Sequence, residues 1–230
     1  MKITVVGCGA LGSFYGARLF KVGYNVNFLL RSDYKIVKQN GIYIESVDGD
    51  FHIKPPCAAN PKEIGISDLV LIGLKTTANC KYKELIGPLA DKHTLILTMQ
   101  NGLGNEELLA EIFGDDNILG GHCFVCLNRV APGVIKHIAH GRCVIGEYKR
   151  KPLERTYAIA SMFKKANIQC DVVENLEKAH WEKLVWNIPF NGLGVAGIAG
   201  FEAVLTGKVI PDKISNKTLT TDILLSDKKW

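Results

Sequence analysis

The stretch that decides the fold lies near the amino terminus and reads Ile3-Thr4-Val5-Val6-Gly7-Cys8-Gly9-Ala10-Leu11-Gly12. Residues 3–6 are typical of a short buried strand, and they lead directly into the pattern G-x-G-x-x-G. In such a turn the first glycine bends the chain, the second lets a pyrophosphate approach the backbone, and the third allows the next helix to pack on the strand. The phosphates bind at the free N–H groups that open this helix. The motif therefore predicts a dinucleotide-binding site. Its candidate binding residues are Gly7, Cys8, Gly9, Ala10, Leu11 and Gly12. A turn that is merely rich in glycine is the alternative.

Beyond this motif, apolar runs of strand type alternate with segments of helical period. Strands are expected at 26–30, 69–74 and 94–99, helices at 78–90 and 104–113, and a hairpin around Asp48-Gly49. Residues 117–147 are rich in strand formers, and a helix near 153–166, a strand near 170–173 and a long helix capped by Asn175 follow. Apolar strands between helices indicate a parallel sheet that is covered on both faces. We therefore predict an α/β fold with a Rossmann-type domain.

The composition is that of a globular protein and excludes several classes of function. Of 230 residues, 47% are hydrophobic and 22% are charged, which excludes a disordered tail, a collagen-like repeat and a coiled coil. The net charge of +5 is spread along the chain, so we expect no nucleic-acid partner and favour a small anionic ligand. The longest uncharged run, residues 184–201, contains asparagines, a proline and four glycines, which excludes a membrane span.

The seven cysteines are expected to be free thiols in a reducing, cytoplasmic environment, because their number is odd and their density is far below that of a disulfide scaffold. Cys123 and Cys126 form one C-x-x-C pair without a second pair to accompany it. The strand-type sequence around them would send alternate side chains to opposite faces, so we expect no metal site.

Arg31 follows the second predicted strand, at the place where an acidic residue would bind the ribose hydroxyls of NAD. A planar guanidinium matches a 2′-phosphate, which an acidic side chain would repel, so the sequence favours NADP(H). Asp33 lies only two residues further on. An exposed arginine without a ligand is the alternative interpretation.

Two further strands end in polar residues. Lys75 follows residues 69–74, and Asn101 follows residues 94–99. Because the carboxyl ends of parallel strands line the ligand crevice of an open α/β sheet, we expect both side chains where cofactor and substrate meet. Considered alone, Lys75 or Asn101 could equally be an exposed loop residue without a binding role.

The helix expected from Leu176 carries Lys183, Asn187 and Asn191 at positions i, i+4 and i+8, so the three share one face. The two asparagines lie among apolar neighbours, where an unpaired amide is costly, and a ligand or exposed backbone would satisfy them. Pro189 predicts a kink or a helix end between them. The alternative is that both asparagine amides only form hydrogen bonds with the backbone groups whose helical hydrogen bonds are broken at Pro189.

Two longer motifs are more specific than the glycine turn: Q-N-G-x-G-N at residues 100–105 and W-x-K-L-x-x-N-x-x-x-N at residues 181–191. Together with the amino-terminal turn, Leu30-Arg31, Leu74-Lys75 and residues 141–147, they resemble the ketopantoate reductase family over residues 1 to about 206. The resemblance implies NADPH-dependent reduction of 2-dehydropantoate to pantoate, on the route to pantothenate and coenzyme A. It also implies a Rossmann domain followed by an all-helical domain.

The resemblance further implies roles for single residues. Lys183 would be the catalytic acid, because an ammonium group stabilises the negative charge that develops on the ketone oxygen and supplies the proton. His180, one turn earlier, is an alternative acid. The binding roles, carried over by position, fall to Gly7, Gly9, Gly12, Arg31, Lys75 and Asn101 for NADPH, and to Asn101, Asn187 and Asn191 for the substrate, a small 2-keto acid.

The sequence departs from the family after Leu205-Thr206. Further helices of the family contribute a serine and a glutamate to the substrate site, and neither motif is found in the lysine-rich residues 207–230. We therefore expect a Rossmann domain at residues 1–174 and a shortened, truncated all-helical domain at 175–230, whose tail diverges from about residue 207. A homodimer is a candidate assembly, since a second subunit would complete the site. Two other functions stay open: a non-catalytic NADP(H)-binding remnant or sensor, and a reductase of another 2-keto acid.

Overall fold

The computed structural model describes residues 1–196, and the first of its two compact units, Met1–His180, is built on a ten-stranded mixed sheet. Six strands run parallel in the order β5-β2-β1-β6-β7-β8. Their bounds are Cys57–Ala58 (β5), Asn25–Leu29 (β2), Lys2–Val6 (β1), Leu69–Ile72 (β6), Leu95–Thr98 (β7) and Ile118–Ala131 (β8). This is the Rossmann order, in which ligands bind beside the switch point at the carboxyl ends of the strands. The predicted Rossmann-type fold is confirmed.

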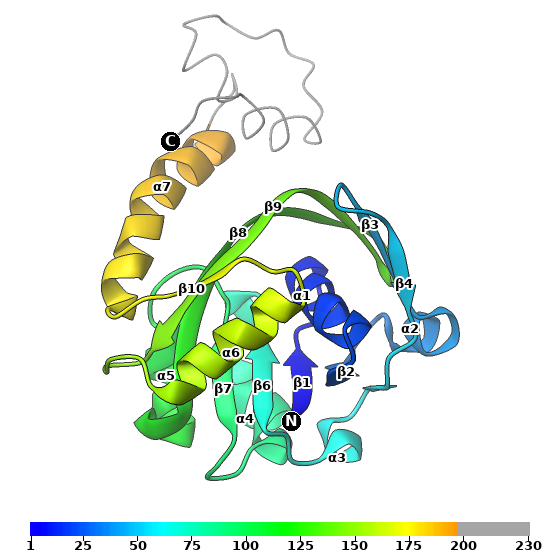
Figure 1. Ribbon diagram of the computed structural model, residues 1–230, viewed down its shortest axis with the longest axis horizontal. Coiled ribbons are helices and arrows are strands. Elements are labelled where there is room, and N and C mark those ends of the chain that lie inside the picture. The colour runs from blue at the N-terminus through cyan, green and yellow to red at the C-terminus, as the bar shows by residue number, and fades with distance from the viewer. Residues whose placement is uncertain (197–230) are drawn as a thin grey trace, which may run out of the picture. The chain divides into compact units, whose positions relative to one another are not determined.

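Beyond β8 the sheet continues as a long antiparallel hairpin and curls over helix α1 (Ala10–Lys21), as Figure 1 shows. The pairing runs from β8 to β9 (Val134–Glu147), then to β3 (Ile42–Ser46) and β4 (Phe51–Ile53), and β10 (Cys170–Val172) also pairs with β9. The hairpin expected around Asp48-Gly49 is the β3–β4 pair. Helix α1 contacts β1 and β2 as well as β8, β9, β3 and β4, and it is buried from Gly12 to Ala17. The curled sheet therefore encloses the helix that follows the glycine turn.

Two apolar clusters fill the two faces of the sheet. Along β1, Ile3 and Val5 belong to the cluster that contains α1, whereas Val6 belongs to the cluster that contains Tyr82. This alternation follows from the two-residue period of a strand. Burial on both faces explains why these strands are apolar throughout.

The remaining helices of the first unit are short. They are α2 (Tyr34–Asn40), α3 (Pro61–Ile64), α4 (Tyr82–Ile86), α5 (Asn105–Phe113) and α6 (Glu154–Lys165), with 3-10 turns η1 (Thr76–Lys81), η2 (Gly87–Leu89) and η3 (Asp115–Asn117). The helix expected over 78–90 is thus divided among η1, α4 and η2. Pro88 explains its last break, because proline lacks an N–H and restricts the residue before it.

Helix α7 (Leu176–Ala196) begins in the first unit and continues into the second, which starts at Trp181. Asn175 caps it as expected, because its Oδ1 accepts a hydrogen bond from the N–H of Lys178 at 2.8 Å. The helix does not end at Pro189 but is continuous through it. No helix within residues 1–196 is both long and apolar enough to cross a membrane.

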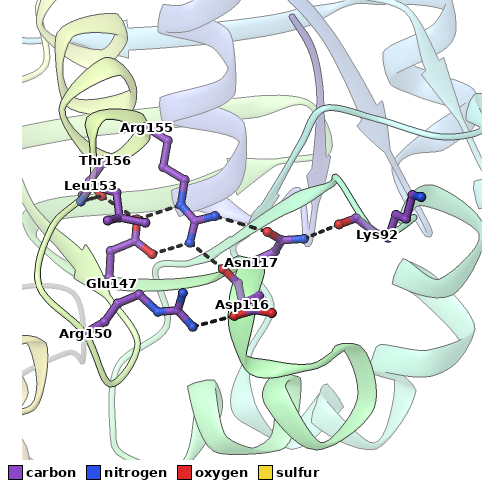
Figure 2. Close-up of polar contacts among 8 residues, drawn as sticks. All are labelled: Lys92, Asp116, Asn117, Glu147, Arg150, Leu153, Arg155 and Thr156. Atoms are coloured by element: carbon purple, nitrogen blue, oxygen red, sulfur yellow. Dashed lines mark hydrogen bonds and ion pairs between the residues drawn. The ribbon is translucent and has the colours of Figure 1, made fainter.

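A buried carboxylate at the end of β9, Glu147, ties α6 to the sheet (Figure 2). Its side chain is 0% exposed and accepts hydrogen bonds from Nε and Nη2 of Arg155, at 3.0 and 2.6 Å, and from Oγ1 of Thr156 at 2.5 Å. Arg155 also donates to Oδ1 of Asn117 at 3.2 Å. Because a buried carboxylate is costly without partners, this bidentate pair holds the start of α6 against β9.

The substitution Arg155→Met should lower the free energy of unfolding by about 3–5 kcal/mol, because it leaves the buried Glu147 carboxylate without its counter-charge. Urea denaturation at pH 7 measures this change.

The matched control is Arg150→Met, which breaks the exposed Arg150–Asp116 pair, whose N–O distance is 2.9 Å. Asp116 is 91% exposed, so this change should cost less than about 1 kcal/mol. Equal losses for the two variants would show that burial of Glu147 does not govern the interaction.

Candidate functional site

The backbone of the glycine turn lies against neighbouring backbone at two of its three glycines. Gly7 has φ +90°, and a Cβ on it would lie 2.3 Å from the N atom of Leu74, just after β6. A Cβ on Gly12 would lie 2.4 Å from the carbonyl oxygen of Gly7. A Cβ on Gly9 would meet nothing within 4 Å. The first and third glycines are therefore required for packing, and the second faces open space.

The start of α1 has the properties of an anion site. Gly9 is its N-cap and provides no side-chain cap, so the first N–H groups of the helix keep their hydrogen-bonding capacity. No acidic residue stands in the first turn, where Ala10 and Leu11 are half-buried. The positive end of the helix dipole adds to this field. The open space over Gly9 and these N–H groups together fit the pyrophosphate of a dinucleotide.

Cys8 connects the turn to the end of β2. Its Sγ donates to the carbonyl oxygens of Leu29 and Val5, at 3.2 and 3.4 Å. Burial raises the pKa of the Cys8 thiol, and the neighbouring Cys57 and Asp33 add to the effect, so the thiol keeps its proton and acts as a donor. The turn and the residues after β2, including Arg31, are therefore brought together.

Arg31 is exposed, and its guanidinium forms no hydrogen bond or ion pair with other residues of the described chain. Asp33, in contrast, is buried and engaged: Arg129 of β8 binds it through both Nε, at 2.8 Å, and Nη2, and the N–H of Gly133 donates to it at 3.2 Å. Burial favours the neutral form of Asp33, but the hydrogen bonds from Arg129, Ser32 and Gly133 outweigh it and hold its pKa below the ordinary value. Its charge is therefore neutralised by Arg129.

Lys75 and Asn101 are both exposed at the carboxyl ends of neighbouring strands. β6 and β7 are parallel with Ile72 opposite Thr98, so the loops that follow them start side by side. Lys75 directly precedes η1, and Asn101 lies in the loop between β7 and α5. Because Gly7 packs against Leu74, the residue before Lys75, the glycine turn also lies at the carboxyl end of β6.

The three expected substrate-site residues on α7 belong to the second unit. Lys183 and Asn187 are half-buried and lie one turn apart on the helix. Asn191 lies in the last turns of α7, and its side chain falls outside the described part of the structure.

His180, the alternative acid, is 5% exposed and pairs with Glu106 of α5, with 3.0 Å between Nε2 and Oε1. Nε2 of the His180 ring is thus engaged by a carboxylate. A cavity of about 410 Å³ opens beside this pair, and its lining includes Leu103, Gly104, Glu107, Tyr148 and Lys149.

The seven cysteines all lie in the described chain, and none of them forms a disulfide bond there. Cys123 and Cys126 lie on β8, and residues 1–196 hold no group of three or more side chains arranged to bind a metal ion.

Sequence reasoning missed two groups of residues near the expected site. Glu106 is the partner of His180, and Asn79 and Asn105 hydrogen bond to each other at 2.9 Å between the loops after β6 and β7. Asn105 stands in the Q-N-G-x-G-N motif, which is the one signal that could have singled it out. Asn79 and Glu106 stand in no motif.

Comparisons with known proteins agree with one another. The sequence profile described as ketopantoate reductase PanE/ApbA matches residues 3–150. A 2-dehydropantoate 2-reductase from Nostoc sp. (strain PCC 7120) is 42% identical over 200 residues, covering 84% of this chain and 63% of the relative. The crystal structure of 2-dehydropantoate 2-reductase from Geobacter metallireducens GS-15 is 49% identical, with a TM-score of 0.82, over 84% of this chain and 65% of that one. The corresponding structure from Methylococcus capsulatus is 35% identical, with a TM-score of 0.83, over 90% and 68%.

The match covers 63% of the length of the Nostoc relative. The profile match nevertheless covers more than half of this chain, and it includes the glycine turn, Arg31, Lys75 and Asn101. Sequence profile, relatives and fold lead to one conclusion: the chain belongs to the ketopantoate reductase family.

Proposed function

We propose that the chain binds NADPH and acts in the reduction of 2-dehydropantoate to pantoate. The observation that carries the proposal is the open space over Gly9 at the start of α1, between two glycines that admit no side chain. The name of the family and of the Nostoc relative supplies the substrate, a small 2-keto acid. Reduction of another 2-keto acid uses the same residue types and is distinguished by the assay below.

The preference for NADPH over NADH follows from charge. Arg31 presents an exposed guanidinium beside the glycine turn, where a 2′-phosphate would pair with it. The acidic side chain nearest in sequence, Asp33, is bound by Arg129 and Gly133 and does not face the ribose as a free carboxylate. A ligand with a 2′-phosphate therefore meets an available cation and no repelling anion.

Bound NADPH supplies the hydride for the ketone carbon. In this proposal Lys183 donates a proton from Nζ to the ketone oxygen, and its positive charge stabilises the negative charge that builds there. Asn187 and Asn191, on the same helix, hold the substrate through their amide groups. Lys75 and Asn101 border the nicotinamide end of the cofactor.

The proposal extends to the setting of the reaction. It assigns residues 1–174 to the cofactor domain and residues 175–230 to a helical domain. A homodimer would give the substrate site a second side. The reaction belongs to the route to pantothenate and coenzyme A in the cytoplasm, a reducing compartment that suits seven cysteines without a disulfide bond.

The substitution Arg31→Met should raise the Kd of NADPH about 10- to 100-fold and leave the Kd of NADH within about twofold, because only NADPH carries the 2′-phosphate. Fluorescence titration of each nucleotide measures both constants.

The matched control is Lys92→Met, which removes one positive charge from an exposed site before β7, at the amino ends of the parallel strands and away from their carboxyl ends. Both constants should stay at the wild-type values. Equal affinity of the wild-type chain for NADPH and NADH would contradict the assignment of Arg31.

The substitution Lys183→Met should lower the 2-dehydropantoate-dependent oxidation of NADPH at least about 100-fold, because it removes the general acid, while the Kd of NADPH stays unchanged. The loss of absorbance at the nicotinamide band measures the rate.

The control for this variant is Lys178→Met, an exposed lysine earlier on α7. Its rate should equal that of the wild type. A wild-type chain that binds NADPH and oxidises none of it with 2-dehydropantoate or other 2-keto acids would instead support a non-catalytic NADP(H)-binding protein.

A further inference from the structure

A series of side-chain amides connects the loops that follow β6 and β7. Nε2 of Gln100 donates to Oδ1 of Asn79 at 2.9 Å, and Nδ2 of Asn79 donates to Oδ1 of Asn105 at 2.9 Å. Nδ2 of Asn105 then donates to the carbonyl oxygens of Asn101 and Gly102, at 3.4 and 3.5 Å. Three amides, from the end of β7, from η1 and from the start of α5, thus lead to the backbone of Asn101. We call Gln100, Asn79 and Asn105 the amide chain.

The direction of the amide chain is fixed at its buried end. The hydroxyl groups of Tyr82 and Thr98 both donate to Oε1 of Gln100, at 2.5 and 2.9 Å. That oxygen is therefore an acceptor, and Nε2 of Gln100 is left to donate towards Asn79. Burial raises the pKa of Tyr82, so its hydroxyl keeps the proton that it donates. Each amide in turn accepts on one side and donates on the other.

The loop that carries Asn101 depends on such bonds for its conformation. Gly102 and Gly104 have φ of +98° and +87°. Glycine adopts positive and negative φ about equally readily, so these two residues do not by themselves fix the conformation of the loop. Leu103 between them is 44% exposed and adds little burial. Asn105, in contrast, is 1% exposed, and its two bonds to Asn101 and Gly102 attach this loop to the protein interior.

The same chain reaches the loop of Lys75. Asn79 lies in η1, which starts directly after Lys75, and the N–H of Ala78 donates to the carbonyl oxygen of Lys75 at 2.8 Å. None of the hydrogen bonds that the amide chain makes within the described residues goes to the glycine turn or to Arg31. Its influence is thus confined to one side of the proposed cofactor site.

We propose that Asn79 and Asn105 are positioning residues, which hold Lys75 and Asn101 in place for the nicotinamide half of the cofactor. The inference rests on the proposed binding of NADPH. The adenosine half depends on the glycine turn and Arg31, so loss of the amide chain should affect the two halves differently.

The test compares NADPH with 2′,5′-ADP, which carries the adenosine half and the 2′-phosphate but no nicotinamide. Asn79→Ala and Asn105→Ala should each raise the Kd of NADPH about 3- to 10-fold and leave the Kd of 2′,5′-ADP within about twofold. The double variant should lose no more than the larger single loss, because the two amides act in series. Isothermal titration calorimetry measures both ligands on the same samples.

The matched control is Asn25→Ala, at an exposed asparagine that opens β2 at the amino end of the sheet, and it should change neither constant. Asn79 is only half-buried, so Asn79→Ala decides the matter even if the variant at the buried Asn105 does not fold. An unchanged Kd of NADPH in Asn79→Ala, or an equal loss for both ligands, would overturn the positioning role while leaving the proposed function intact. A wild-type chain that binds no NADPH would overturn both.

Discussion

The contact between Gly7 and the backbone after β6 is the constraint on which the rest of the structure depends. No side chain fits there, and none fits at Gly12 against the carbonyl of Gly7. This close approach lets α1 start directly at the carboxyl end of β1 and lie under the curled sheet. The amino end of α1 is thereby set beside the ends of β2 and β6, where an anion meets its free N–H groups.

Two of the buried acidic groups in the described chain, Asp33 and Glu147, are matched by arginines from other elements. Asp33 after β2 is bound by Arg129 of β8, and Glu147 at the end of β9 is bound by Arg155 of α6. The first pair joins residues 96 positions apart, and the second joins neighbouring elements only eight residues apart. Each pair takes a carboxylate out of the surface available to ligands. Arg31 stays exposed. The local charge beside the glycine turn is therefore positive, although the chain contains almost as many acidic as basic residues.

The elements that have a local sequence pattern could be predicted from the sequence. The contacts between residues that are distant in sequence could not. The glycine turn has a strand before it and a helix after it, and the buried strands have apolar runs, so the Rossmann order followed. The pairing of β3 with β9 has no local sequence pattern that predicts it, because Tyr43 and Val134 are far apart in sequence and become neighbours only in the folded sheet. The same holds for the site: Arg31, Lys75 and Asn101 follow predicted strands, whereas Asn79 is defined by its bonds to Gln100 and Asn105.

The late position of β9 in the chain has a consequence for synthesis on the ribosome. Helix α1 and β3 emerge early, but β9, which pairs with β3 and closes the sheet over α1, comes from residues 134–147. Until those residues have left the exit tunnel, Phe14 and Tyr15 lack part of the cover that they have in the native protein. Such long-range closure slows folding, so the nascent amino-terminal half leaves apolar surface exposed until β9 has been made.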